Sequence, residues 1–130
     1  EMQERIEKHQ QDRGEHWNTF ETRTEICQAI RTAQSEGADF IIVDCLTFWI
    51  SNILMKDENA LKRRTDEFIS FIPKIEVKTA FVTNEVGSGI VPENKLSRQF
   101  RDAAGFLNQK VADAVDSVVF MVSGIPVTVK

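Results

Sequence analysis

Hydrophobic residues recur along the chain at the spacing of amphipathic helices. Apolar positions that begin after Thr24 follow the helical period as far as Gly37, a residue type that suits the position just after a helix. The same period is found from Leu46 to Leu54, and a long version of it runs through the last third of the chain. The predicted helices start near residues 24, 46 and 61, with a long one from about 94 to 116 and a short one in residues 1–9.

Short apolar runs between these helices predict strands. Phe40 to Val43 is a largely β-branched run between two aspartates, which is typical of a strand buried on both faces of a parallel sheet. Residues 79–83 form a second such run, and residues 117–122 and 127–130 give the last two predicted strands. Strands that alternate with helices favour an α/β fold with a mostly parallel sheet.

Composition and charge exclude several classes of protein. A chain of 130 residues suits a single domain, and 42% hydrophobic with 28% charged residues is typical of a soluble globular protein. No apolar run approaches the roughly 20 residues of a membrane-spanning helix. The net charge of -4 disfavours nonspecific binding to nucleic acid but is compatible with small anionic ligands.

The cysteines and the first residues bear on where the protein works. Cys27 and Cys45 lack the spacing of metal ligands, so we expect both to be reduced and buried in a cytoplasmic protein. Residues 1–5 contain neither an initiating Met nor an apolar leader. We therefore expect no secretory signal and a chain that starts within a longer protein.

Asp44 is the first candidate for chemistry. Ligands of an open parallel sheet bind at the carboxyl ends of its strands, and Asp44 directly follows the run 40–43. An acid in this position can hold Mg²⁺ beside a nucleotide phosphate. The alternative is that Asp44 or Thr47 only caps the helix that starts near Leu46.

A glycine-rich stretch after the second strand is the next candidate. It contains Asn84, Glu85, Gly87 and Gly89, and its two glycines permit positive φ and a close approach of the backbone to a ligand. The alternative is an ordinary connection between a strand and a helix. Its length and its paired polar residues favour an active-site loop that contacts the substrate.

His9 is the third candidate and lies four positions before Arg13. A neutral imidazole can attack phosphorus, and a nearby guanidinium can hold phosphate oxygens through two hydrogen bonds. His16 is interpreted as a packing or solvated histidine without a catalytic role. Arg98 and Arg101 are interpreted as the solvated face of the long helix, with contact to an anion as the alternative.

Several stretches together resemble one enzyme family. They are the histidine region from Arg5 to Trp17, the loop VTNEVGSGIVPEN that ends at Asn94, the FRDAAG stretch followed by Asn108 and Gln109, and VSGIP near the end of the chain. These stretches are similar to the bifunctional adenosylcobinamide kinase/adenosylcobinamide-phosphate guanylyltransferase family of cobalamin biosynthesis. The resemblance covers nearly the whole chain, and the TNEVGxGIVPEN loop is its most specific part.

The resemblance implies a three-layer fold of the P-loop NTPase type and two reactions on one corrinoid. The first moves the γ-phosphoryl group of a nucleoside triphosphate, ATP or GTP, to the hydroxyl of adenosylcobinamide. The second joins GMP from GTP to adenosylcobinamide phosphate, releases pyrophosphate and gives adenosylcobinamide-GDP. The family also implies a homotrimer.

The resemblance assigns roles to individual residues as well. His9 matches the histidine that carries the guanylyl group, and Asp44 matches the acid that serves Mg²⁺. The residues implied to contact the guanine nucleotide are Gln10, Gln11, Asp12, Arg13, Glu21 and Asp44.

Two departures from the family pattern shape the expectation for this chain. Gly14 stands where the family commonly has proline, which loosens the turn after Arg13. No G-x-x-x-x-G-K-[ST] motif occurs in the 130 residues, although the family opens with a strand and a loop of this kind. We therefore expect residues 1–130 to be a single domain, the C-terminal part of a P-loop kinase and guanylyltransferase. The alternative is a non-catalytic fragment that binds nucleotide or assists assembly.

Overall fold

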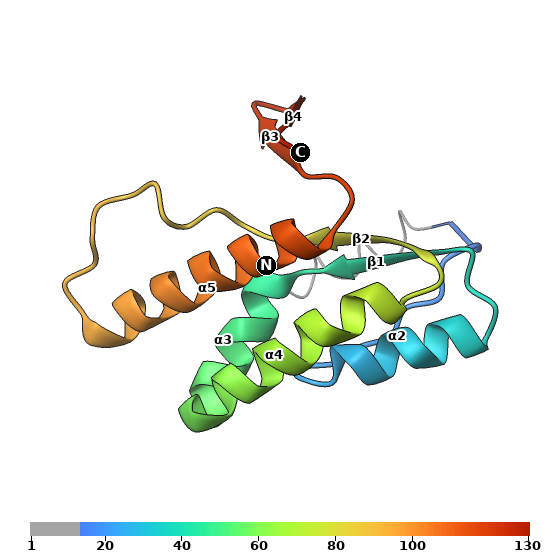
Figure 1. The fold of residues 1–130 in the computed structure, drawn as a ribbon, viewed down its shortest axis with the longest axis horizontal. Helices are drawn as coiled ribbons and strands as arrows, with labels where there is room; N and C mark the ends of the chain where they lie inside the picture. Colours follow the sequence, from blue (N-terminus) through green and yellow to red (C-terminus); the bar gives the residue numbers. More distant parts are fainter. Residues whose placement is uncertain (1–13) are drawn as a thin grey trace.

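The computed structural model describes residues 14–130, in which four α-helices share a core with one face of a short parallel sheet and a hairpin follows (Figure 1). Short 3-10 turns at Glu58–Ala60 and Ile72–Lys74 flank the helix Leu61–Phe71. In chain order the elements are α2 (Ile26–Ser35), β1 (Phe40–Asp44), α3 (Leu46–Lys56), α4 (Leu61–Phe71), β2 (Lys78–Val82), α5 (Lys95–Ala114), β3 (Val119–Val122) and β4 (Ile125–Thr128).

The helices and strands expected from the pattern of apolar residues within this range are confirmed, with small shifts at their ends. Gly37 follows α2 with φ of 82°, a conformation that glycine adopts without strain. The last strand begins two residues earlier than predicted and contains Pro126, which lies opposite Met121. The helix predicted in residues 1–9 lies outside the described residues.

The strands β1 and β2 pair in parallel, so Val43 lies beside Phe81 and Asp44 beside Val82. Because alternate residues of a strand point to opposite faces, Ile41, Val43 and Phe81 share one face, and all three pack in the hydrophobic core. The other face is open: Phe40, Ile42 and Val82 are 46%, 47% and 41% exposed. The prediction of a strand buried on both faces is therefore wrong for β1.

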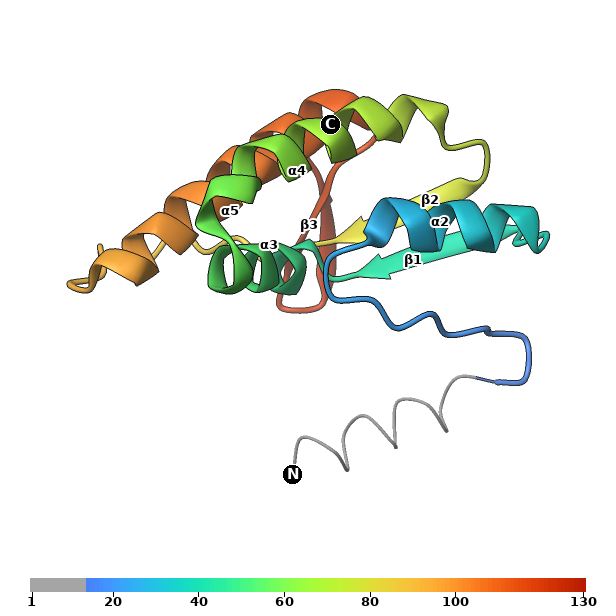
Figure 2. The same ribbon diagram turned by 90° about the horizontal axis from the view of Figure 1, so that it is seen from below.

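The core lies between the closed face of this sheet and the helices. Phe68 of α4 is completely buried, and its ring lies 5.1 Å from that of Trp49 and 5.4 Å from that of Phe81, measured between centroids. Leu46 and Leu107 bring α3 and α5 into the same cluster. Figure 2 shows α4 and α5 side by side, with the two parallel strands below them.

The last two strands form a hairpin of their own. A two-residue turn, Ser123-Gly124, joins β3 to β4, and both residues have positive φ as a type I′ turn requires. The hairpin pairs with neither β1 nor β2, so the predicted α/β fold with a parallel sheet is confirmed for β1 and β2, whereas β3 and β4 form a separate antiparallel sheet. Lys130 ties its end to the helix layer because its Nζ donates hydrogen bonds to three carbonyl oxygens at the end of α5. Within residues 14–130, no helix has the length and apolarity to cross a bilayer.

Candidate functional site

The carboxyl ends of β1 and β2 meet at one edge of the sheet. Asp44 and Val82 are partners in the last pair of the register, so Asp44 and the loop that begins at Thr83 leave the sheet together. Asp44 is exposed, its peptide bond to Cys45 is cis, and its carboxylate accepts no hydrogen bond from any of residues 14–130. The residue before α3 is Cys45 and has no capping side chain, so the alternative that Asp44 or Thr47 caps this helix is wrong.

Thr47 binds the start of the loop instead. Its Oγ1 accepts hydrogen bonds from the backbone N–H and the side-chain Nδ2 of Asn84, at 2.8 and 3.1 Å. From the opposite side, Nδ2 of Asn108 on α5 donates to the carbonyl oxygen of Asn84 at 3.2 Å. Asn84, two residues after the end of β2, is therefore held by hydrogen bonds to α3 and to α5.

The middle of the loop is folded around the Glu85 carboxylate. The N–H of Gly87 donates to Oε1 of Glu85 at 2.7 Å, and Nη2 of Arg101 donates to the carbonyl oxygen of Gly87 at 2.6 Å. A Cβ atom at position 87 would lie 2.7 Å from Oε1 of Glu85. Neither Gly87 nor Gly89 adopts the positive φ that glycine permits, and Gly87 matters through the space that it leaves beside Glu85.

The end of the loop is fixed to the start of α5. Nη1 of Arg98 donates to the carbonyl oxygens of Pro92, at 3.0 Å, and of Glu93. Oδ1 of Asn94 accepts a hydrogen bond from the N–H of Ser97 at 2.8 Å and so caps the helix. Both arginines interpreted as solvated residues or anion contacts thus donate to carbonyl oxygens of the loop.

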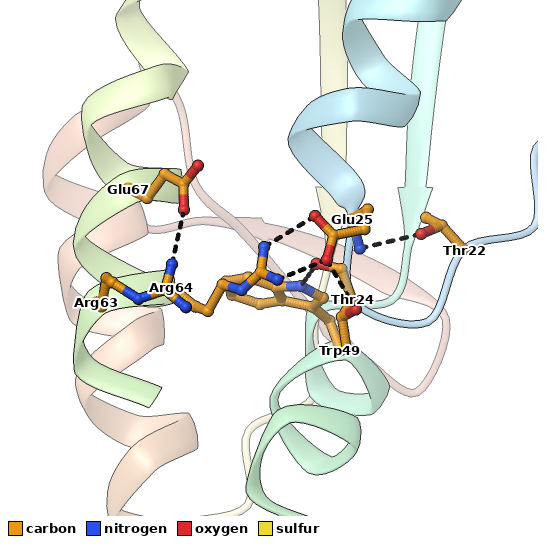
Figure 3. Close-up of polar contacts among 7 residues, drawn as sticks. All are labelled: Thr22, Thr24, Glu25, Trp49, Arg63, Arg64 and Glu67. Atoms are coloured by element: carbon orange, nitrogen blue, oxygen red, sulfur yellow. Dashed lines mark hydrogen bonds and ion pairs between the residues drawn. The ribbon is translucent and has the colours of Figure 1, made fainter. Parts of the chain in front are cut away.

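A second group of contacts fixes the segment that precedes α2 (Figure 3). Arg64 of α4 donates to both carboxylate oxygens of Glu25, at 2.6 and 2.8 Å, and the indole Nε1 of Trp49 donates to the carbonyl oxygen of Thr24 at 2.9 Å. Nδ2 of Asn52 donates to the carbonyl oxygen of Arg23 at 3.2 Å. The hydrogen bonds from Arg64 lower the pKa of Glu25.

Of the remaining site candidates, only some lie within the described residues. Glu21 lies exposed in the segment before α2 and makes no hydrogen bond to Asp44 or to the loop. His16 is also exposed in this segment. The other residues assigned to nucleotide binding and catalysis, His9, Gln10, Gln11, Asp12 and Arg13, lie outside the described residues.

Other polar groups lie away from the strand ends. A groove of about 460 Å³ between α4 and α5 is lined by Asp66, Ser70, Lys110 and Asp113, among others. Lys110 and then Lys62 lower the pKa of Asp66 to about 2. Both cysteines are free and half-buried rather than fully buried, and burial raises the pKa of Cys27. Residues 14–130 contain no group of three or more potential metal ligands.

Sequence reasoning found the acid and the loop but gave Thr47 and Asn108 no role in the site. Asn108 carries a detectable signal, because it lies four positions after Ala104 and three before Val111 on the buried stripe of α5. A polar side chain on such a stripe needs a hydrogen-bond partner. Thr47 is harder to identify from the sequence, where its one indication is that it carries the first hydroxyl after the end of β1.

The arrangement defines an α/β protein whose candidate ligand site is formed by an acid without a partner in residues 14–130 and an anchored loop, at the carboxyl ends of parallel strands. The chain belongs to the cobinamide kinase / cobinamide phosphate guanyltransferase family, whose model matches residues 1–129. It is 39% identical to the bifunctional adenosylcobalamin biosynthesis protein CobU of Salmonella typhimurium and 38% identical to that of Escherichia coli, and covers 79% of each. It is 34% identical to the bifunctional adenosylcobalamin biosynthesis protein CobP of Pseudomonas aeruginosa and covers 75% of it. All three matches span the whole of this chain. The resemblance seen in the sequence is confirmed.

Proposed function

We propose that this protein phosphorylates adenosylcobinamide and then transfers GMP from GTP to the product, giving adenosylcobinamide-GDP. The observation that carries the proposal is the family match over residues 1–129. The geometry supports it, because the most specific loop of the family pattern begins at the strand edge that also carries Asp44. Positioning and electrostatic stabilisation supply most of the catalysis in phosphoryl transfer, and an anchored loop serves positioning.

We assign nucleotide and Mg²⁺ to the Asp44 side of this edge and the corrinoid to the loop. A single exposed carboxylate without a partner in residues 14–130 suits Mg²⁺, which proteins commonly hold through one or two carboxylates together with substrate phosphates. Bound Mg²⁺ neutralises charge on those phosphates. Asn84, Glu85, Gly87 and Gly89 then form the substrate loop, and the nucleotide contacts are Glu21 and residues 10–13. A fold of the P-loop NTPase type and a homotrimer complete the proposal.

His9 is the proposed nucleophile of the transferase reaction. Its ring nitrogen attacks the α-phosphorus of GTP, so a P–N bond forms while the P–O bond to pyrophosphate breaks. A phosphate oxygen of adenosylcobinamide phosphate then attacks the same phosphorus, and the P–N bond breaks to release adenosylcobinamide-GDP and free His9. The covalent intermediate divides one difficult displacement into two.

The test is the intact mass of the full-length protein after incubation with GTP and Mg²⁺. We expect one added guanylyl group on the wild type and on His16→Ala, the matched histidine control, and none on His9→Ala. Subsequent addition of adenosylcobinamide phosphate should remove the group. An adduct that persists in His9→Ala would contradict the assignment of the nucleophile.

The kinase reaction is tested separately, by transfer of label from the γ-phosphate of ATP or GTP to adenosylcobinamide. Asp44→Asn should reduce this transfer strongly, and Asp39→Asn, at the other end of the same strand, should not. The second candidate is a non-catalytic module for nucleotide binding or assembly. Nucleotide binding with neither adduct nor transfer would support that candidate and exclude the enzyme.

A further inference from the structure

The side chains of Thr47, Thr83 and Asn108 form a ring of hydrogen bonds that is closed by the backbone of Asn84. Oγ1 of Thr47 lies 3.4 Å from Oγ1 of Thr83, which donates to Oδ1 of Asn108 at 2.8 Å. Nδ2 of Asn108 reaches the carbonyl oxygen of Asn84, whose own N–H returns to Thr47. The ring joins α3, the end of β2 and α5.

The donors and acceptors fix the direction of this ring. A hydroxyl has one proton and two lone pairs. Two N–H groups of Asn84 occupy the lone pairs of Thr47, so the proton of Thr47 goes to Thr83. The proton of Thr83 then goes to Oδ1 of Asn108, which turns Nδ2 of Asn108 towards the Asn84 carbonyl. Every member both donates and accepts, and hydrogen bonds in such a chain strengthen one another.

The ring also determines what Asn84 offers to a ligand. Its N–H, its carbonyl oxygen and its side-chain Nδ2 are all engaged. Its side-chain Oδ1 is the polar atom of Asn84 that makes no hydrogen bond to residues 14–130. An amide oxygen held in this way can accept a hydrogen bond from a hydroxyl or amide donor.

The two residues that hold Asn84 come from rigid parts of the fold. Thr47 follows the completely buried Leu46, and Asn108 follows Leu107, which is 1% exposed. Each side chain is itself half-buried. A positioning residue on a packed helix holds its partner more precisely than one on a loop.

We propose that Thr47 and Asn108 are positioning residues that orient Asn84, so that its Oδ1 accepts a hydrogen bond from the hydroxyl or an amide group of the corrinoid substrate. This inference rests on the proposed function, because it takes the Asn84 loop as the substrate loop. Neither residue touches the reacting atoms. Their removal leaves the loop attached through Arg98 and Arg101 but frees the amide of Asn84 to rotate.

The test compares isosteric variants of the full-length protein. Thr47→Val removes the hydroxyl at nearly constant shape, and Thr47→Ser keeps it. Thr32→Val makes the same change on α2, where the hydroxyl donates to the carbonyl oxygen of Gln28 within its own helix. Asn108→Asp removes the donor to Asn84, and Gln109→Ala is its exposed neighbour as control. Two quantities are measured: hydrogen exchange of the Asn84 amide by NMR, and the kinetics of phosphoryl transfer to adenosylcobinamide.

We expect Thr47→Val and Asn108→Asp to lower kcat by about 10- to 100-fold, the size of effect that a small misplacement produces, with little change in KM for the nucleotide. Exchange of the Asn84 amide should accelerate in Thr47→Val, and Thr47→Ser should restore both readouts. Faster exchange with an unchanged kcat would overturn the positioning role while leaving the proposed function intact. A wild type without phosphoryl transfer would overturn the proposed function, and the role of the ring in that reaction with it.

Discussion

The two faces of the β1–β2 sheet carry similar apolar residues in very different surroundings. Ile41 and Ile42 are neighbours in the chain, yet Ile41 is 8% exposed and Ile42 is 47% exposed. The closed face packs on a single core formed by α2, α3, α4 and α5. The open face has no helix of the described residues against it (Figure 2). Hydrophobic stabilisation depends on area removed from water, so the same residue type contributes very differently on the two faces.

The closed face also supports the candidate site, through the helices that pack on it. The helices of the closed face supply Thr47, Arg98, Arg101 and Asn108, which hold the loop at the strand ends. Substitutions deep in the closed face should therefore affect both stability and the site. Substitutions of the apolar residues on the open face should cost less stability and leave the site largely unchanged.

Phe68→Ala should give the largest effect. We expect it to lower the free energy of unfolding by about 3 to 5 kcal/mol, because it removes a completely buried ring that contacts Trp49 and Phe81 and leaves a cavity. Phe40→Ala on the open face should cost about 1 kcal/mol, since half of that ring is already in water. Urea denaturation followed by circular dichroism measures both. Equal losses would show that the open face is buried in solution.

Adjacent residues of β1 provide a sharper version of the same comparison. Ile41→Ala should lower the free energy of unfolding by about 2 to 4 kcal/mol, and Ile42→Ala by about 1 kcal/mol or less. Both variants delete the same atoms from the same strand, so strand propensity cancels between them. A larger effect at Ile42 than at Ile41 would reverse our assignment of the two faces.

The difference between the faces shows where sequence reasoning stops. The apolar run in β1 predicts a strand and its limits, because a short β-branched run has few other solutions. It does not say whether a helix covers each side, since the pattern describes the strand and not its neighbours. The hairpin has the same limitation: the turn residues Ser123 and Gly124 predict a reversal, but not which strands pair.

The candidate site divides in the same way. Asp44 and the loop from Asn84 follow apolar runs directly, so the rule for strand ends finds them from local sequence. The ring around Asn84 joins residues 37 and 25 positions apart, Thr47 to Asn84 and Thr83 to Asn108. No local pattern reports such contacts. The reason for glycine at position 87 is equally non-local in kind, because the space for a side chain there is taken by the carboxylate of Glu85 and the φ of Gly87 is not positive.

The ion pair between Arg64 and Glu25 should give a smaller effect than the core substitutions. It joins α4 to the residue before α2, on the closed side of the sheet, and its bidentate geometry is the favourable one for a pair that is partly exposed. We expect Arg64→Ala to lower the free energy of unfolding by about 0.5 to 1 kcal/mol. Arg64→Lys should recover only part of this, since an ammonium group cannot bind both oxygens in the same way.

Arg63→Ala is the matched control for this pair. Arg63 lies one position away and faces Glu67 at 3.7 Å in an exposed contact within the same helix (Figure 3). Its loss should cost about 0.3 kcal/mol. If the two alanine variants unfold at the same urea concentration, the contact between α4 and Glu25 contributes nothing beyond an ordinary surface pair.

The smallest effect concerns Asp66, which joins α4 to α5 through Lys110 and also binds Lys62. These two lysines lower its pKa from 3.8 to about 2, so folding favours the ionised carboxylate. The stabilisation is therefore fully present above pH 3.8 and is lost as the pH falls towards 2. Asp66→Asn should be less stable than the wild type at neutral pH, and the difference between their urea midpoints should shrink through this window.

Asp113→Asn, in the same groove but without an ion pair to the described residues, should follow the wild type throughout. A difference between wild type and Asp66→Asn that stays constant down to pH 2 would mean that the lysines do not hold this carboxylate in solution, and that apolar packing alone joins α4 to α5.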